Sequence, residues 1–488
     1  MALFIVITLI AVGILVATTL TVGFEGALPF FAFLVILLPG ESRISFGDLF
    51  VVTSTRVIIA TMVVLFFALG NQHPKSDRNN RLPLKYLLIL YVVWRFVSTL
   101  NSVVFMTSLR VVLDNTLEFY LLYYILARSI SNVKTIHKIL AASIAALVVC
   151  CAFGAVERFT HWRVADLFPV VLHRLEAGEG GRLGPGDRLR STFPHPILYA
   201  NALALGIPWV LYFLSLAKTA AQKICLWGAL IMMTWNIYKT GSRGPWLALA
   251  MSLVVLFFFL QGSIRKYLLV IAFLTVATLI VRPGVLETLT TTYHATRDPD
   301  SLRGTSYQYR YELMHAGVRA ISHNVGRALW GFGPESFYHL GLEAEVALTG
   351  KTEELESCDS AWVEVMIEAG YVGLFLVAAL LMGAALLSWK GFKTVPPPAN
   401  SLCLVFMVSI GAYAFMMLSV EDFGWGQQTF MLWMILAMSV VYPRLASSGA
   451  SLGKRSFQAL PEFEGNSLRR PSDRPNRALA GARHFERG

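Results

Sequence analysis

The chain has 488 residues, of which 56% are hydrophobic and only 15% are charged, and its mean hydropathy is +0.59. A water-soluble fold could not cover so much apolar surface, so the composition indicates an integral membrane protein. The net charge of +11 comes largely from a C-terminal tail and from short loops, so it does not indicate a nucleic-acid partner.

The hydrophobic segments are long and continuous. A helix needs about 20 apolar residues to cross a bilayer, whereas the strands of an outer-membrane barrel are short and alternating. We therefore expect an all-α polytopic membrane protein with about 12–13 transmembrane helices. The expected spans are 2–22, 25–39, 50–70, 86–106, 109–127, 139–156, 196–216, 224–240, 245–261, 267–282, 360–388, 401–420 and 428–442.

The loops between these spans differ in their basic residues. Lysine-rich loops, which the positive-inside rule places in the cytoplasm, lie at 71–85, 128–138, 217–223, 262–266 and 389–399. Alternation then puts the N-terminus and the two long loops, 157–192 and 283–358, outside the cytoplasm. These two loops carry eleven arginines and one lysine. Because a guanidinium can bind phosphate through two parallel hydrogen bonds, this bias favours a phosphate-bearing substrate.

Residues 443–488 form a basic tail after the last span. The tail has nine lysines or arginines against four acidic residues, is rich in Gly, Pro and Ser, and shows no apolar period. Such a composition is typical of a disordered segment, here a cytoplasmic one that can contact lipid. The rest of the chain, 1–442, is expected to be one transmembrane domain.

Three segments contain polar residues that indicate chemistry, and the first leads into the span 196–216. It contains Arg188 and Arg190, followed by Phe193-Pro-His-Pro196. The two prolines prevent an earlier helix start at the membrane rim. The arginines could bind a lipid-linked phosphate there or only extend to the interface, and both possibilities stay open. Asn201, one turn into the span, is a candidate polar partner within the bundle.

The second segment is the tight turn Thr240-Gly-Ser-Arg-Gly-Pro-Trp246. An arginine in a short outer turn runs against the positive-inside rule, so its presence calls for a reason. Pro245 is expected at the first position of the next helix. Because the amides of that helix start lie beside Arg243, we favour an anion site over a purely structural turn.

The third segment, 306–333, is expected to form an amphipathic helix in the long loop 283–358 and to end in a glycine turn. Its apolar stripe at helical spacing consists of Tyr311, Met314, Val318 and Ile321. Arg310 lies at the edge of this stripe, so it is either paired with a carboxylate or held for a ligand. His315 is a candidate base, although a solvated surface role is commoner for such a histidine.

In this order, the segments resemble the O-antigen ligase and polymerase family of bacterial surface-polysaccharide assembly. The matching motifs are the proline-flanked segment with Asn201, the Ser-Arg-Gly-Pro-Trp turn at 242–246, Arg310 ahead of Trp330-Gly-Phe-Gly333, Asp359-Ser-Ala-Trp-Val-Glu364, and Glu368-Ala-Gly-Tyr-Val-Gly373. They cover residues 190–380, together with the many-span layout and one long outer loop late in the chain.

The resemblance implies a GT-C-type membrane glycosyltransferase. Such enzymes transfer a glycan from undecaprenyl diphosphate to a glycan acceptor at the periplasmic face of the bacterial inner membrane, without a required metal or cofactor. O-antigen or exopolysaccharide biosynthesis is the implied pathway. Arg190, Arg243 and Arg310 match the family's diphosphate-binding arginines, with Arg188 as a neighbouring alternative. The implied partners are the lipid-linked donor, the acceptor, the bilayer and other polysaccharide-assembly membrane proteins.

One position departs from the ligase pattern. Ligases that load glycan onto lipid A core typically have a histidine where this sequence has Asp359. The aspartate could be the general base that activates the acceptor hydroxyl, or Asp359 or Ser360 could cap the helix of the span 360–388. Glu364 and Glu368, one turn apart on that helix, are further candidate bases or partners of intramembrane arginines. The missing histidine favours a polymerase over a ligase.

The alternative function is a lipid-linked oligosaccharide flippase or exporter without catalytic activity, because it would also need arginines that bind phosphate. Such a protein would place its cations in a central cavity and would have little use for the long loop. Arg95 and Glu118 could line that cavity or could belong to a structural ion pair. The sequence shows neither a nucleotide-binding motif nor the Cys/His spacing of a metal site.

Overall fold

The computed structural model describes residues 2–40, 43–46, 50–69, 82–168, 188–260, 262–281, 302–346, 351–355, 357–420, 423–424 and 426–458. The chain divides into two units, Met1–Ser447 and Ser448–Gly488. The expected tail 443–488 is described only as far as Gln458, where it continues the last helix. The rest of the tail lies outside the described residues.

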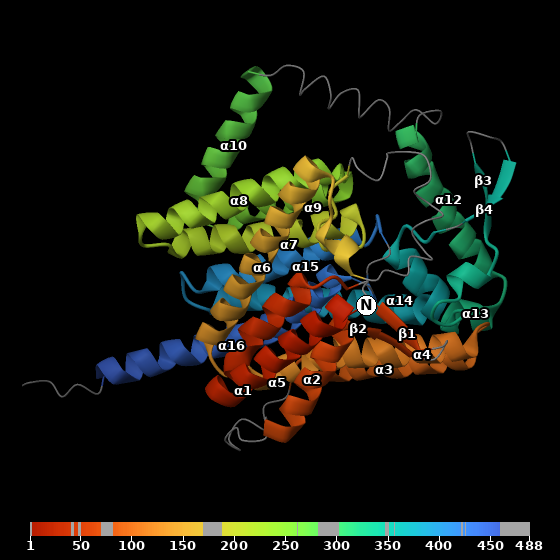
Figure 1. Ribbon diagram of the computed structural model, residues 1–488, viewed down its shortest axis with the longest axis horizontal. Helices are drawn as coiled ribbons and strands as arrows, with labels where there is room; N and C mark the ends of the chain where they lie inside the picture. Colours follow the sequence, from red (N-terminus) through yellow and green to blue (C-terminus); the bar gives the residue numbers. More distant parts are fainter. Residues whose placement is uncertain are drawn as a thin grey trace, which may run out of the picture. The chain divides into compact units, whose positions relative to one another are not determined.

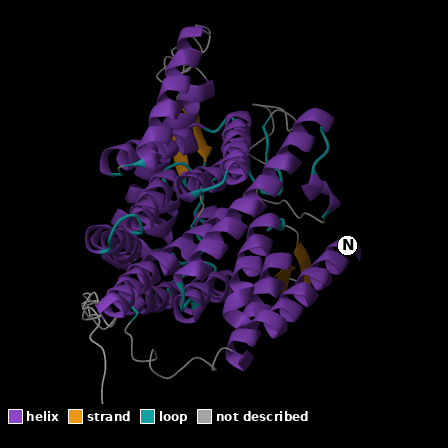
Figure 2. Ribbon diagram, turned by 90° about the vertical axis from the view of Figure 1, so that its left-hand side faces the viewer, coloured by secondary structure: helices purple, strands orange, loops and turns teal. Residues whose placement is uncertain are grey.

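The described residues are mostly helical, which confirms an all-α polytopic membrane protein (Figures 1 and 2). The strands among them form two small antiparallel hairpins, β1–β2 and β3–β4. The elements are α1 (Ala2–Leu37), β1 (Arg43–Phe46), β2 (Phe50–Thr53), α2 (Ser54–Leu69), α3 (Lys85–Leu100), α4 (Phe105–Asn115), η3 (Thr116–Tyr120), α5 (Leu121–Ser129), α6 (Val133–Thr160), η4 (Val164–Leu167), α7 (Pro196–Leu216), α8 (Ala220–Thr240), α9 (Arg243–Phe259), α10 (Ser263–Val281), α12 (Leu302–Ser322), α13 (Val325–Trp330), η5 (Phe337–His339), β3 (Glu343–Val346), β4 (Lys351–Glu354), α14 (Ala361–Thr394), α15 (Asn400–Met416) and α16 (Gln427–Gln458).

The helices follow the expected spans closely. Among the described residues, five helices are long and apolar enough to cross a membrane, namely α1, α6, α7, α14 and α16. The helices α2, α9 and α15 are shorter but also apolar. The expected span 109–127 is divided among α4, the π-helical segment η3 and α5, which follow one another without a break.

The first two expected spans form the two halves of α1, which is broken at Gly23. The φ of Gly23 is 79°, a left-handed value that glycine adopts at little cost. Before the break, the Thr8 hydroxyl lies 2.7 Å from the Ser54 hydroxyl at the start of α2. Just after the break, Glu25 accepts hydrogen bonds from the backbone and side chain of Ser131, which precedes α6. The two halves therefore lie along different helices.

The end of α1 lies near the loop before α7. The Gln427 amide donates to the Leu38 carbonyl at 3.1 Å and to the Thr192 carbonyl at 2.9 Å. The hairpin β1–β2 then joins this end of α1 to the start of α2. The chain thus runs away from this side before Gly23 and back towards it afterwards, as two successive spans require.

The long loop builds a small core of its own on α14. Leu313, Ala316 and Ile321 of α12 are buried in one cluster with Val363 and Ile367 of α14. The expected apolar stripe of α12 is only partly buried, because the helix turns a neighbouring face towards α14. Ile321 is inside, whereas the exposed members of the stripe are Tyr311, Met314 and Val318.

The glycine turn after α13 fastens this region to the membrane helices. Gly331 and Gly333 both have positive φ, and a Cβ on Gly331 would overlap the backbone of Glu368. The N–H groups of Phe332 and Gly333 donate to the Ile367 and Glu368 carbonyls, each at 2.9 Å. The Trp330-Gly-Phe-Gly333 motif therefore has a clear structural role as a close backbone contact.

Candidate functional site

The loop before α7 is anchored to the end of α6. Glu157 accepts hydrogen bonds from the backbone N–H groups of Arg190 and Ser191, the latter at 2.7 Å. The loop ends at His195, whose Nδ1 accepts a hydrogen bond from the Ile197 N–H at 3.2 Å and so caps α7. The backbone on both sides of this loop is therefore held in place.

Arg188 joins the same loop to the turn between α8 and α9. Its Nε donates to the Thr240 carbonyl at 2.8 Å, and its Nη2 donates to Ser242 Oγ at 3.0 Å. The helix α9 begins at Arg243, so Pro245 lies within its first turn and not at the expected first position. Arg188 thus supports the turn that presents Arg243.

The tip of this turn touches the loop between α15 and α16. The side chain of Arg243 is exposed there, and a Cβ on Gly244 would lie 2.8 Å from Ser419 Oγ. The Ser419 carbonyl in turn accepts a hydrogen bond from Arg310 Nη2 at 3.2 Å. The segments that carry Arg243 and Arg310, far apart in sequence, therefore meet at Ser419.

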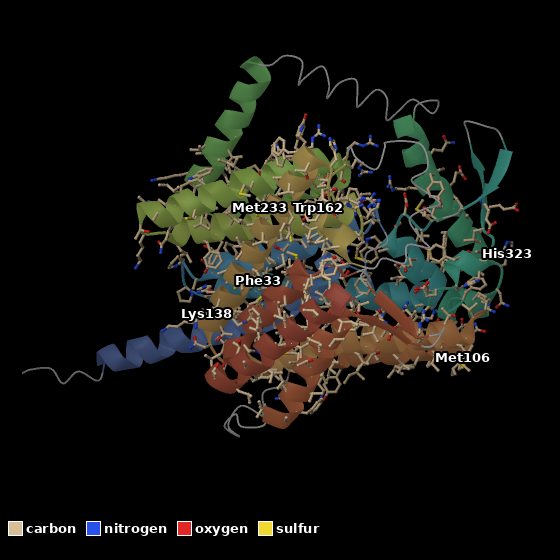
Figure 3. All side chains as sticks on the ribbon, viewed as in Figure 1. Phe33, Met106, Lys138, Trp162, Met233 and His323 are labelled. Carbon is tan, nitrogen blue, oxygen red and sulfur yellow. The ribbon has the colours of Figure 1, made fainter. Side chains whose placement is uncertain are left out.

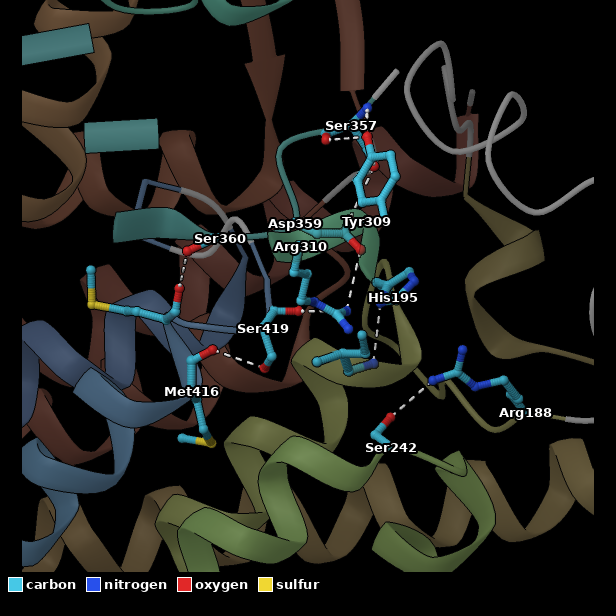
Figure 4. Close-up of polar contacts among 12 residues, drawn as sticks. Arg188, His195, Ser242, Tyr309, Arg310, Ser357, Asp359, Ser360, Met416 and Ser419 are labelled. Atoms are coloured by element: carbon cyan, nitrogen blue, oxygen red, sulfur yellow. Dashed lines mark hydrogen bonds and ion pairs between the residues drawn. The ribbon is translucent and has the colours of Figure 1, made fainter. Parts of the chain in front are cut away.

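A polar network holds Arg310 at this position (Figure 4). Its Nη2 also donates to Asp359 Oδ2 at 3.2 Å, and Asp359 Oδ1 accepts a hydrogen bond from Ser357 Oγ at 3.0 Å. The Tyr309 hydroxyl donates to the Ser357 carbonyl at 2.7 Å and accepts from the Ser357 N–H at 3.0 Å. Burial raises the pKa of Tyr309, so its hydroxyl keeps the proton that this network needs.

Three arginines act on one histidine at the centre of these segments. Partial burial, followed by three neighbouring guanidinium groups, lowers the pKa of His195 to about 3. These groups belong to Arg188, Arg190 and Arg310. Figure 4 shows the imidazole between Arg310 and Arg188. We call the four residues Arg188, Arg190, Arg243 and Arg310, with His195, the cationic site.

The segment that supplies two of these arginines matches a known family. Residues 228–378 match the family model described as O-antigen ligase. The chain contains an O-antigen ligase domain. No curated protein matches the chain. The O-antigen ligase domain extends from α8 into α14 and includes Arg243, Arg310 and Asp359, which confirms the family resemblance seen in the sequence.

Within the O-antigen ligase domain, Asp359 does not cap α14. The residue before the helix is Ser360, and its hydroxyl donates to the Met417 carbonyl at 3.2 Å. The Ala361 N–H donates hydrogen bonds to the carbonyls of Met417 and Val420. The Asp359 carboxylate is directed to Arg310 instead, so the expected cap is not formed, and its role as a base stays a prediction.

Glu368 of the O-antigen ligase domain lies in a closed ion pair. Arg95 Nη1 is 2.6 Å from Glu368 Oε2, and both side chains are 5% exposed. The other carboxylate oxygen accepts a hydrogen bond from the Glu335 N–H. Glu118, the second intramembrane charge noted in the sequence, pairs with Arg56. Glu368 is therefore the partner of an intramembrane arginine, one of the two roles expected for it.

Three other candidates have different surroundings. The His315 ring packs against Tyr311 on α12, with ring centroids 4.4 Å apart. Asn201 is buried within α7, and Glu364 lies in the first turn of α14. The functional roles of these three residues stay predictions. Among the described residues, no group of three His, Cys, Asp or Glu side chains could hold a metal ion.

Glu157, His195 and Ser419 belong to the site but were not among the candidates from the sequence. Glu157 looks like any charged residue that follows a span, and Ser419 lies inside the end of the expected span 401–420. For His195 a signal was present, because it precedes Pro196 at a helix start, where a capping side chain is common.

Proposed function

We propose that the cationic site binds the diphosphate of an undecaprenyl-diphosphate-linked glycan, and that the chain transfers this glycan to a glycan acceptor. O-antigen-related glycan transfer in general follows from the family domain. The observation that supports the finer assignment is the group of three arginines around His195, with Arg243 across Ser419 from Arg310. Guanidinium groups suit a diphosphate because each can donate two parallel hydrogen bonds.

In this reaction the acceptor hydroxyl oxygen forms a bond to the anomeric carbon of the donor glycan. The bond from that carbon to the diphosphate oxygen breaks, and its electron pair leaves with undecaprenyl diphosphate. Guanidinium groups that are already in place stabilise the charge that develops on the leaving group. The hydroxyl proton passes to a base, for which Asp359 is the candidate because its carboxylate adjoins Arg310.

We place the site on the periplasmic side of a bacterial inner membrane. Lys138, near the start of α6, and His323, just after α12, lie at opposite ends of the helices (Figure 3). Beside Lys138, His137 Nε2 is 2.9 Å from the hydroxyl of Tyr212, near the end of α7, which the lysine-containing loop 217–223 follows. Arg190 of the cationic site is held instead by Glu157, near the opposite end of α6. The positive-inside rule favours the lysine-rich end for the cytoplasm.

We further propose that the enzyme is a polymerase, which would join lipid-linked glycans in O-antigen or exopolysaccharide synthesis. The support is the aspartate at 359, where ligases typically have a histidine. A flippase finds less support, because Arg95 and Glu368 are buried against each other in the membrane region. A pair so enclosed is unlike the accessible cations that a central cavity would need.

The decisive experiment supplies purified protein in nanodiscs with undecaprenyl-diphosphate repeat units as the sole substrate. Growth of a ladder of longer lipid-linked chains is the expected result. Product that forms only after a lipid A core acceptor is added would identify a ligase. Movement of the lipid-linked glycan across a liposome membrane, without any new glycosidic bond, would identify a flippase. Arg310→Ala is the control and should abolish the ladder.

A further inference from the structure

His195 lies at the centre of the cationic site, but the proposed transfer has so far given it no task. The residue comes from the loop before α7, and its side chain is half-buried. Guanidinium groups reach it from two directions, from its own loop and from α12. Figure 4 shows the imidazole between Arg310 and Arg188, so an anion held between these two arginines would lie beside the ring.

The hydrogen bond at Nδ1 determines which nitrogen of the ring carries the proton. A backbone N–H can only donate, so Nδ1 must accept the hydrogen bond from Ile197 and carries no proton itself. The single proton of the neutral ring then lies on Nε2. Burial, and then the three guanidinium groups, disfavour an imidazolium here, so the ring of the unliganded protein is neutral at physiological pH.

We propose that His195 is a further donor-binding residue, whose Nε2–H donates a hydrogen bond to a phosphoryl oxygen of the lipid-linked diphosphate. This role depends on the proposed function, since it requires that the arginines hold a diphosphate. The ring adds a directed hydrogen bond that the guanidinium groups do not supply, and its orientation is set by the first turn of α7.

A neutral donor has an advantage among so many cations. Undecaprenyl diphosphate is both the anchor of the donor and the leaving product. A further positive charge would bind it more tightly in both states and would slow its release. An imidazole N–H adds direction without adding charge, so it can orient the diphosphate while product still dissociates.

The test compares His195→Asn with the wild type for binding of undecaprenyl diphosphate to the full-length protein in nanodiscs. Asparagine is a good N-cap, so its side-chain oxygen can still accept the Ile197 N–H and keep α7 intact. The shorter side chain cannot place a donor where Nε2 lies. A lost hydrogen bond to a charged group should weaken binding about tenfold to a hundredfold.

A helix cap far from the cationic site provides the matched control. Asn132 caps α6 at the other end of the helices, where its Oδ1 accepts a hydrogen bond from the Lys134 N–H at 2.9 Å. Asn132→Ala should lower the thermal midpoint but leave the affinity for undecaprenyl diphosphate unchanged. A similar loss of affinity in Asn132→Ala would show that binding responds to general stability, and would overturn the role of His195.

The pH profile separates a neutral donor from a cationic one. The charged groups that act on the ring are Arg188, Arg190 and Arg310. Asp359 accepts a hydrogen bond from Arg310, and Glu157 accepts one from the Arg190 N–H. Between about pH 5 and 8, the wild-type affinity should show no protonation step that His195→Asn lacks. A step lost in the variant would mean that the ring binds as an imidazolium.

The remaining outcomes distinguish the two levels of inference. Equal affinity of the wild type and His195→Asn would overturn the role of His195 and leave the proposed function standing. Failure of the wild type to bind undecaprenyl diphosphate at all would overturn both. A protonation step in the affinity that persists in His195→Asn comes from the phosphate, and the proposed role of His195 then stands.

Discussion

Replacing Arg95 by methionine is expected to destabilise the protein strongly, because the Glu368 carboxylate would stay buried without its partner. The two charged groups are 2.6 Å apart, and 5% of each side chain is exposed. Removing one partner of such a buried pair costs about 3–5 kcal/mol of unfolding free energy. The Glu335 N–H, which donates to the same carboxylate, would lose a well-placed acceptor.

The double variant, in which Arg95 and Glu368 are both methionine, should be less destabilised than Arg95→Met alone, because no unpaired charge remains. Arg56→Met is a useful comparison, since the Arg56 side chain is 30% exposed, against 5% for Arg95, and its loss should cost less. The free energies can be measured by reversible SDS unfolding in mixed micelles. A loss below about 1 kcal/mol in Arg95→Met would refute the view that this pair is closed to water.

Further variants test the site and the topology. Arg243→Lys should lose nearly as much polymer production as Arg243→Ala, because an ammonium cannot make two parallel bonds to a diphosphate; full production at equal protein level would show that charge alone suffices. Asp359→Asn should still bind donor but turn over at least about 100-fold more slowly, whereas near-normal turnover in the ladder assay would exclude the aspartate as the base. In spheroplasts, an impermeant maleimide should label the cysteine of Ser322→Cys, because this position is exposed. It should not label Cys358, which is 1% exposed. Labelling of Ser322→Cys only after lysis would mean that the topology is inverted. Gly370→Ala should lower the thermal midpoint, because its φ is 67° and a Cβ there would overlap the backbone at the end of α13; an unchanged midpoint would mean that this contact yields easily.

Hydrophobic length was enough to predict most of the helices from the sequence. The boundary between the spans 2–22 and 25–39 lies beside Gly23, where the helix breaks. Length and hydropathy work here because the bilayer imposes them on each segment separately. They do not decide which face of a helix is buried. In α12 apolar residues lie on more than one face, and only packing against α14 decides that Leu313 is inside and Met314 outside.

The sequence predicted which arginines form the cationic site but not how they are arranged. From local rules alone, the turn at Arg243 predicted an anion site, and Arg310 at the edge of an apolar stripe was expected to have a partner. The partner of Arg310 could only be narrowed to a carboxylate or a ligand, because Asp359 lies beyond the rest of the long loop. A pair so far apart in sequence depends on how α12 packs on α14, and a short sequence pattern does not predict that packing. For the same reason, the sequence did not predict that Arg95 pairs with Glu368, which lies more than half the chain later.

The hydrogen bond from Arg310 to Ser419 has a consequence for biogenesis. Membrane helices are inserted as they are synthesised, so the loop with Arg188 reaches its side of the membrane long before the loop after α15 does. Until Ser419 is in place, Arg310 lacks the carbonyl that accepts a hydrogen bond from its Nη2 beside Asp359. A nascent chain therefore has the arginines of the cationic site but not their final geometry. We expect this geometry, and with it the proposed donor binding, to arise only when the last helices have been inserted.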